Sequence, residues 1–357
     1  MYKKKKFNFL VLISRYKYKS NIELDYYYFI TESLKYCNYK YLSVLFNKKN
    51  NIVNIREITS FLKKKNVIIL AEANIEYNYL YPDVFINLIK KSKHKIISFF
   101  GDFDKNQINS KFIELSDFIL MFDKTYVDWC NNNFKIKKFH YIHSFPIIRK
   151  SKYTFSTFEN RYYDVSYSGS KKSFRISFIY IFLKLYGKKY LTFFRFLDNQ
   201  KLIQNKYSSY VNILLKSKFY FCTRAGLYEN NPLSKFNYSQ GRYAGRISEA
   251  IAAGCIPVYW QPKKPNNFID KFILKNRFYR LKYLNGFFIG DKNSRPYDVF
   301  DENFKGMMVI VDSPQDLNDQ ISRLTKNQIK KKLQLLNAFY YKFIHPKVFF
   351  KKILSLV

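Results

Sequence analysis

Short apolar runs alternate with amphipathic stretches along most of this 357-residue chain. Runs such as 67–70 (VIIL) and 95–100 have the length of buried strands, and residues 82–91 between them have the spacing of a helix. Strands that alternate with helices pair in parallel through helical crossovers, so the pattern predicts an α/β fold. Further strands are expected at 7–14, 41–46, 118–122, 139–142, 163–167, 190–194, 219–222, 256–260 and 308–311.

A polar and basic stretch interrupts this alternation between residues 147 and 161. The pattern restarts at residue 163, so we predict two doubly wound, Rossmann-like α/β domains facing a cleft, over residues 1–150 and 151–357. A basic helix over residues 328–343 is expected to close the chain, with the last helix packing back on the first domain.

Composition excludes several classes of protein. Hydrophobic residues make up 47% of the chain, which excludes a disordered chain, and no apolar run approaches the length of a membrane span. Four widely spaced cysteines without a CxxC pair argue against zinc and redox sites and suit a reducing cytoplasm. The net charge of +37 comes from lysines spread along the chain, in a composition typical of A/T-rich codons. That dispersion argues against nucleic acid as a partner, but it leaves an anionic membrane surface open, with peripheral attachment of a cytoplasmic protein.

Residues 242–258 (RYAGRISEAIAAGCIPV) carry the clearest local signal. They predict a short helix that ends at Gly254, where a left-handed backbone costs little, followed by a buried strand. Arg242, Arg246 and Glu249 lie at the front of this helix. A helix N-terminus and forked guanidinium donors both attract phosphate, and a carboxylate one turn further on can accept ribose hydroxyls. The segment therefore predicts a site for a nucleotide diphosphate, although a solvated surface charge is the rival interpretation for each arginine.

Several motifs in the second half resemble those of a known family. Residues 217–224 (SKFYFCTR) and 246–258 (RISEAIAAGCIPV) are similar to the donor domain of GT-B-fold glycosyltransferases of the exostosin type. The sequence PVYW at 257–260 resembles the α1,3-fucosyltransferases, and 309–317 (VIVDSPQDL) is typical of GT-B donor domains. The resemblance covers residues 163 to about 340 and reaches the first half only in outline.

The resemblance implies a nucleotide-sugar donor site in the second domain and an acceptor site in the first. Glu249 is expected to contact donor hydroxyls and Arg246 to contact phosphate. A small-residue turn at Gly169 and Ser170 is expected to let backbone N–H groups approach the diphosphate. The full set of expected donor-binding residues is Glu249, Arg246, Arg242, Arg224, Gly169, Ser170, Arg175 and Ser248.

The stereochemistry is predicted from a departure from the family pattern. Retaining GT-B enzymes pair the helix glutamate with a second glutamate eight positions upstream, where this chain has Gly241. The departure favours an inverting reaction, which needs a general base from the first domain. Asp102 and Asp104 follow an expected strand, and Glu72 and Glu76 follow another. His143 is a further candidate base, although a structural role suits both it and His140 better.

Two other functions remain open at this stage. Asp102 and Asp104 form a D-x-D tripeptide, which a metal-dependent GT-A-type transferase would use to hold a divalent ion. The charge alone also allows a basic nucleic-acid-binding or membrane-binding protein without catalysis. The favoured reading is an inverting, metal-independent transferase. It requires no cofactor beyond its UDP- or GDP-sugar substrate and acts on a glycan or lipid-linked acceptor.

Overall fold

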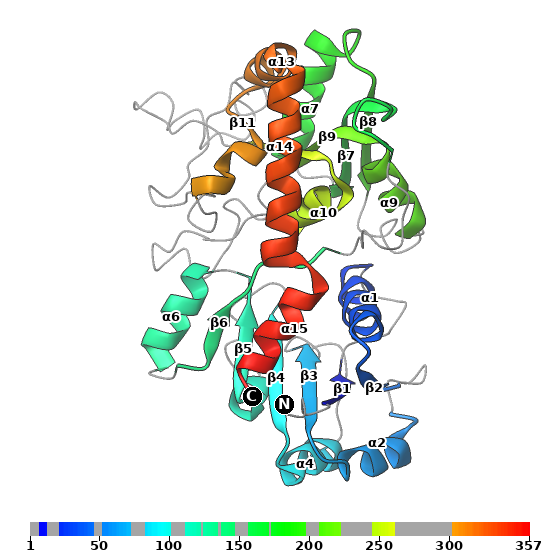
Figure 1. Ribbon diagram of the computed structural model, residues 1–357, viewed down its shortest axis with the longest axis vertical. Coiled ribbons are helices and arrows are strands. Elements are labelled where there is room, and N and C mark those ends of the chain that lie inside the picture. The colour runs from blue at the N-terminus through cyan, green and yellow to red at the C-terminus, as the bar shows by residue number, and fades with distance from the viewer. Residues whose placement is uncertain are drawn as a thin grey trace, which may run out of the picture. The chain divides into compact units, whose positions relative to one another are not determined.

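The computed structural model describes residues 7–12, 21–45, 52–72, 83–100, 111–122, 124–134, 137–146, 156–170, 173–197, 207–222, 245–260 and 302–357. The chain forms two compact units. Unit 1 consists of Met1–Ile147 and Phe343–Val357, and unit 2 of Ile148–Lys342. Each unit is built on one parallel sheet with helices packed against it (Figure 1).

The sheet of unit 1 has six strands in the order β2-β1-β3-β4-β5-β6, all parallel. Its strands are β1 (Asn8–Leu12), β2 (Lys40–Ser43), β3 (Val67–Glu72), β4 (Lys95–Phe100), β5 (Phe118–Met121) and β6 (Phe139–Tyr141). Its helices are α1 (Asn21–Tyr36), α2 (Ile55–Leu62), α4 (Asp83–Ser92), α5 (Lys111–Leu115), α6 (Lys124–Phe134) and α15 (Pro346–Ser355). The direction of winding reverses between β1 and β3, since β2 lies on one side of β1 and β3 on the other.

The sheet of unit 2 has five parallel strands in the order β11-β10-β9-β7-β8. They are β7 (Tyr163–Ser170), β8 (Thr192–Leu197), β9 (Ser217–Cys222), β10 (Ile256–Trp260) and β11 (Val309–Val311). The helical segments are α7 (Ser173–Tyr186), α9 (Tyr207–Leu215), α10 (Gly245–Ala253), the 3-10 helix η5 (Glu302–Met307), α13 (Pro314–Arg323) and α14 (Lys326–Phe339). The direction of winding reverses between β7 and β9, since β8 lies on one side of β7 and β9 on the other. The predicted α/β fold class, with two doubly wound parallel sheets, is confirmed.

The end of the chain differs from the expected single helix over 328–343. Helix α14 ends at Phe339, a π-helical turn (Tyr340–Ile344) follows, and α15 begins at Pro346. Proline fits the first turn of a helix because its missing N–H has no helical partner there, and the His345 side chain accepts a hydrogen bond from the Lys347 N–H. The sequence pattern therefore correctly detected α14, but the prediction that it closes the chain was wrong.

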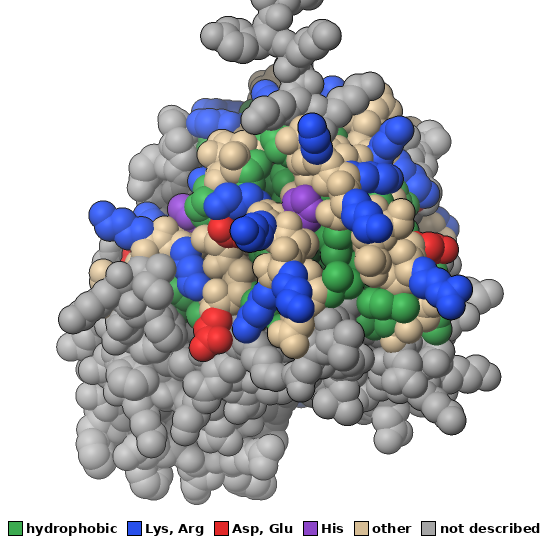
Figure 2. Space-filling model, turned by 90° about the horizontal axis from the view of Figure 1, so that it is seen from below, with side chains coloured by type: hydrophobic (Ala, Val, Ile, Leu, Met, Phe, Trp, Pro, Cys, Tyr) green, Lys and Arg blue, Asp and Glu red, His purple; other side chains and the backbone are tan. Residues whose placement is uncertain are grey.

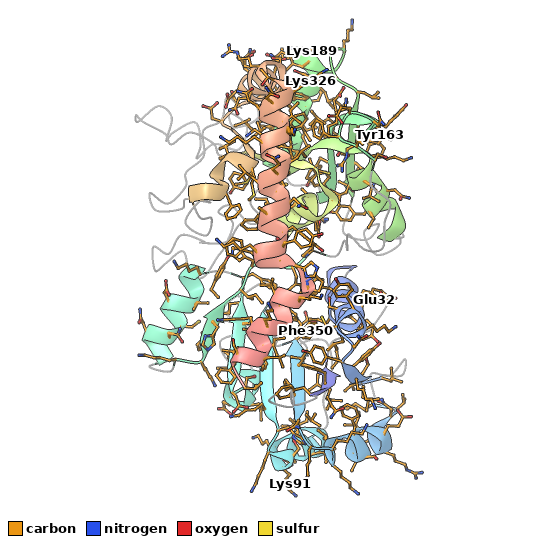
Figure 3. All side chains as sticks on the ribbon, in the orientation of Figure 1. Glu32, Lys91, Tyr163, Lys189, Lys326 and Phe350 are labelled. Atoms are coloured by element: carbon orange, nitrogen blue, oxygen red, sulfur yellow. The ribbon has the colours of Figure 1, made fainter. Side chains whose placement is uncertain are left out.

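Helix α15 supplies part of the core of unit 1. Phe349, Phe350 and Ile353 are buried in one hydrophobic cluster with side chains from β1 and α1. The Phe350 ring lies 5.6 Å from that of Phe9, edge to face, and Figure 3 marks Phe350 on this helix. The last fifteen residues thus belong structurally to the first unit.

We expect Phe350→Ala to destabilise unit 1 by about 3–5 kcal/mol, because a buried aromatic ring is replaced by a cavity. Chemical unfolding measured by circular dichroism will test this. The matched control is Lys351→Ala, an exposed position on the same helix, which should change the free energy of unfolding by under about 0.5 kcal/mol. Equal effects of the two substitutions would contradict the assigned core.

His143 follows β6 and is enclosed in unit 1. Its ring centroid lies 4.8 Å from that of Phe343, and the Tyr141 hydroxyl lies 3.1 Å from its Nδ1. Burial lowers the pKa of His143 from 6.5 to about 4. The imidazole is therefore neutral at pH 7, and its low basicity suits a structural role better than that of a general base.

The lowered pKa of His143 makes stability depend on pH. The unfolded chain takes up a proton below pH 6.5, whereas the folded protein does so only near pH 4, so stability present at neutral pH is lost as the pH falls through this window. The loss amounts to roughly 3 kcal/mol. In urea titrations at several pH values, His143→Phe should flatten the profile between pH 6.5 and 4. If the free energy of unfolding of His143→Phe depends on pH as steeply as that of the wild type, other titrating groups cause the pH dependence.

Within the described residues, no helix is both long enough and apolar enough to cross a membrane.

Candidate functional site

The strands of unit 2 separate at the point where the winding reverses. The register between β7 and β9 runs to Ser166 opposite Tyr220. Beyond it, the Tyr220 hydroxyl accepts a hydrogen bond from the Ser168 N–H at 3.1 Å and donates one to the Ser168 carbonyl at 3.0 Å. Ligands of doubly wound sheets bind at such switch points, beyond the carboxyl ends of the strands. This end of β7 and β9 is therefore the candidate site.

Tyr220 is fully buried, and burial raises the pKa of its phenol well above its usual range. The nearby positive charge of Arg246 works in the opposite direction but does not outweigh burial. The phenol therefore stays protonated, which lets it donate to one backbone group of Ser168 and accept from the other.

Helix α10 brings a guanidinium and a carboxylate to this region. The Arg246 Nη1 atom lies 3.0 Å from Glu249 Oε2, and the two residues are one turn apart at the start of the helix. Tyr210 of α9 joins them, because its hydroxyl donates to the same Glu249 oxygen and its ring lies 4.4 Å below the Arg246 guanidinium carbon. The Glu249 residue is 8% exposed, whereas the Arg246 side chain is 32% exposed. The pair thus offers a solvent-accessible cation beside a sheltered carboxylate.

The predicted end of α10 is confirmed. Gly254 has a φ of +70°, and β10 begins two residues later, at Ile256. A Cβ atom at Gly254 would also lie 3.0 Å from the Arg161 Nη2 atom, so both backbone geometry and space favour glycine. Cys255 is a small core residue that is fully buried, and burial raises the pKa of its thiol to about 11.

Arg161 fixes α10 against the sheet. Its buried guanidinium donates from Nη2 to the Ala253 carbonyl at 2.7 Å and from Nη1 to the Ser217 carbonyl at 2.7 Å. One side chain therefore joins the last residue of α10 to the first residue of β9. A cation also suits the negative end of the helix dipole. Sequence reasoning missed this residue, since an arginine at the edge of a basic linker carries no signal of burial.

Replacing Arg161 should loosen α10. We expect Arg161→Met to lower the melting temperature, because each carbonyl left without a donor costs about 1–3 kcal/mol. Arg161→Lys should restore little, because an ammonium lacks the fork that reaches both carbonyls. Differential scanning calorimetry against the exposed Arg323→Met will check this. If Arg161→Met has the same melting temperature as Arg323→Met, the two hydrogen bonds of Arg161 have no stabilising role.

The predicted turn at Gly169 and Ser170 is wrong. Both residues belong to β7 and pair with Phe196 and Leu197 of β8. A Cβ atom at Gly169 would meet the Tyr167 hydroxyl at 2.6 Å, so packing of a buried ring accounts for the glycine. The strand continues because β8 pairs with it from Val165 to Ser170, a tertiary effect that a Gly-Ser dipeptide does not reveal.

The other predicted donor residues divide into two groups. Ser248 is fully buried within α10, and Arg175 lies in the first turn of α7, after β7. Arg242 and Arg224 lie outside the described residues. A cation that sequence reasoning missed, Arg195 of β8, donates from Nε to Ser168 Oγ at 3.3 Å and so lies at the same switch point. Alternation along β8 gave no reason to select it.

Among the acidic residues predicted as the base, only Glu72 belongs to the described part of the chain. It is the last residue of β3, next to the switch point of the unit 1 sheet, and is 4% exposed. Asp102, Asp104 and Glu76 lie outside the described residues. His140 belongs to β6, and burial, followed by the charge of Lys352, lowers its pKa. In the described part of the chain, no group of three or more His, Cys, Asp or Glu side chains could hold a metal ion.

Some solved structures have a fold similar to that of this chain. No protein-family model matches the chain, and neither does any curated protein. The N-terminal domain of Candida albicans trehalose-6-phosphate phosphatase is similar at 9% identity, over 99% of this chain and 97% of that one, with a TM-score of 0.50. T4 phage BGT in complex with its UDP-glucose substrate is similar at 13% identity, over 95% of both chains, with a TM-score of 0.48.

A third solved structure, of accessory secretory protein 1, 2 and 3 in Streptococcus pneumoniae, is similar at 9% identity with a TM-score of 0.43. That match covers 84% of this chain but only 55% of the other, so the chain spans about half its length. At 9% identity, the similarity to the Candida albicans domain shows the fold alone.

Proposed function

We propose that the protein is a glycosyltransferase that moves a sugar from a nucleotide diphosphate to an acceptor, with inversion and without a metal ion. The observation that carries the proposal is the Arg246–Glu249 pair in the first turns of α10. This helix follows β9, which flanks the switch point where doubly wound sheets bind ligands. A guanidinium at a helix N-terminus matches a diphosphate, and an adjacent carboxylate can accept hydroxyl groups of ribose or sugar.

The residues then divide the chemical work. Arg246, with Arg242 and Arg224, stabilises the negative charge that develops on the leaving diphosphate. Glu249 holds the donor by its hydroxyls. A carboxylate of unit 1 takes the proton from the acceptor hydroxyl, whose oxygen attacks the anomeric carbon as the bond to the diphosphate oxygen breaks. Asp102 is the first candidate for this base, with Asp104 and Glu72 as alternatives, and Glu72 ends a strand at a switch point.

The proposed substrates are a UDP- or GDP-sugar and a glycan or lipid-linked acceptor. We further propose a cytoplasmic protein with peripheral attachment to an anionic membrane as an option, because lysines are abundant on its surface. Exposed lysines occur in both units, and Figure 2 shows them interspersed with apolar and uncharged side chains on one face. The positively charged residues are spread along the chain and do not form one cluster. Their distribution therefore supports the proposed glycosyltransferase over a protein that only binds nucleic acid. The exposed lysines include Lys63, Lys64, Lys65, Lys90, Lys91, Lys326, Lys330 and Lys331.

Nucleotide diphosphates should raise the melting temperature of the protein, because a ligand that binds only the folded state stabilises it. A thermal-shift panel of UDP, GDP and CMP with their sugars will select the donor. Arg246→Ala should reduce both the shift and donor turnover, the latter by roughly 10²-fold as for loss of one charge-stabilising group. Arg323→Ala, an exposed arginine on α13, should behave as wild type.

The opposite results separate the other functions. Full turnover by folded Arg246→Ala would remove this arginine from the site. Activity lost to a chelator would favour the metal-dependent GT-A-type enzyme with Asp102 and Asp104. Salt-sensitive binding to DNA or anionic vesicles without any response to nucleotides would favour the non-catalytic binding protein.

A further inference from the structure

Tyr210 contacts both Arg246 and Glu249 from outside α10. It belongs to α9, whereas the other two belong to α10. Its hydroxyl donates to Glu249 Oε2, and the face of its ring lies 4.4 Å from the guanidinium carbon of Arg246. The hydroxyl and the ring thus make separate contacts, one with each partner.

The Arg246–Glu249 pair needs such support to hold one geometry. The two residues are three positions apart on a helix, and the Arg246 side chain is about one-third exposed. An ion pair of this kind is weak, and an arginine side chain has many rotamers. A tyrosine ring beneath the guanidinium adds a cation–π contact, and its hydroxyl fixes the carboxylate oxygen that faces the arginine.

Tyr210 itself rests on a rigid base. Its ring packs edge to face against that of Tyr220, with centroids 6.4 Å apart. Tyr220 is fully buried, and its hydroxyl is held by both backbone groups of Ser168 on β7. A continuous set of contacts therefore runs from the switch point of the sheet to the charged pair of α10.

We propose that Tyr210 is a positioning residue that holds the Glu249 carboxylate and the Arg246 guanidinium in the geometry that binds the nucleotide diphosphate. This inference rests on the proposed function of the same site. It adds that the hydroxyl acts through Glu249, and that the ring acts through Arg246.

Two substitutions separate the two contacts. Tyr210→Phe removes the hydroxyl and keeps the ring, whereas Tyr210→Leu removes both. Isothermal calorimetry with UDP and with GDP on the full chain should show affinity falling roughly tenfold in Tyr210→Phe, the order expected for a hydrogen bond to a charged group, and further in Tyr210→Leu. Tyr186→Phe is the matched control, because it removes a tyrosine hydroxyl that donates to Gln315 in the same unit.

A double-mutant cycle distinguishes positioning from a general effect on folding. In the Glu249→Gln background, Tyr210→Phe should cause less than a twofold further loss of nucleotide affinity, because the contact through which it acts has already been altered. Melting temperatures without nucleotide, measured on all variants, report any loss of fold separately.

The outcomes bear on the two proposals differently. If the wild-type protein binds neither UDP nor GDP, the proposed function fails and the role of Tyr210 fails with it. If the wild type binds and Tyr210→Phe binds equally well, only the positioning role is overturned. An equal loss in the wild-type and Glu249→Gln backgrounds also overturns it, because the hydroxyl then acts independently of Glu249.

Discussion

The buried guanidinium of Arg161 is the interaction on which the structure around α10 in unit 2 depends. It joins the carbonyl at the end of α10 to the carbonyl at the start of β9, and its Nη2 atom would lie 3.0 Å from a Cβ atom at position 254, where the positive φ also favours glycine. These contacts tie the C-terminal end of α10 to β9. Arg246 lies near the N-terminal end of the same helix and Glu249 at its middle, so the charged pair is carried by a helix that Arg161 holds at its C-terminal end.

The site combines two kinds of polar group with different tasks. Tyr220 and Ser168 satisfy each other in the interior, where an unpaired hydroxyl or backbone group would be costly. Arg246 remains partly exposed and keeps a charge available to a ligand. Tyr210 lies between the buried and the exposed part. The proposed anion site thus combines buried groups whose hydrogen bonds are all made within the protein with a cation that solvent can reach. The buried groups keep the site rigid, and the exposed cation is free to contact a ligand.

Much of the local structure could be predicted from the sequence. Alternation of apolar and amphipathic stretches indicated the strands of both sheets, and Gly254 marked a helix end that the structure confirms. One prediction failed because a distant segment decided the outcome: Gly169 and Ser170 extend β7 because β8 pairs with them. Another failed for a local reason, because α14 ends at Phe339 and Pro346 begins a further helix. Arg161, Arg195 and Tyr210 were missed because their partners lie far away in the sequence.

By itself, the sequence determined the fold class and the helix–glycine–strand unit at 245–260, since both follow from short-range periodicity and from the backbone preferences of single residues. Only the tertiary structure decided which strands are neighbours, that the last fifteen residues complete the core of the first unit, and that Tyr210 contacts Arg246 and Glu249. These features depend on contacts between segments tens to hundreds of residues apart. Such contacts form when apolar surface is buried, and residue spacing along one segment does not encode them.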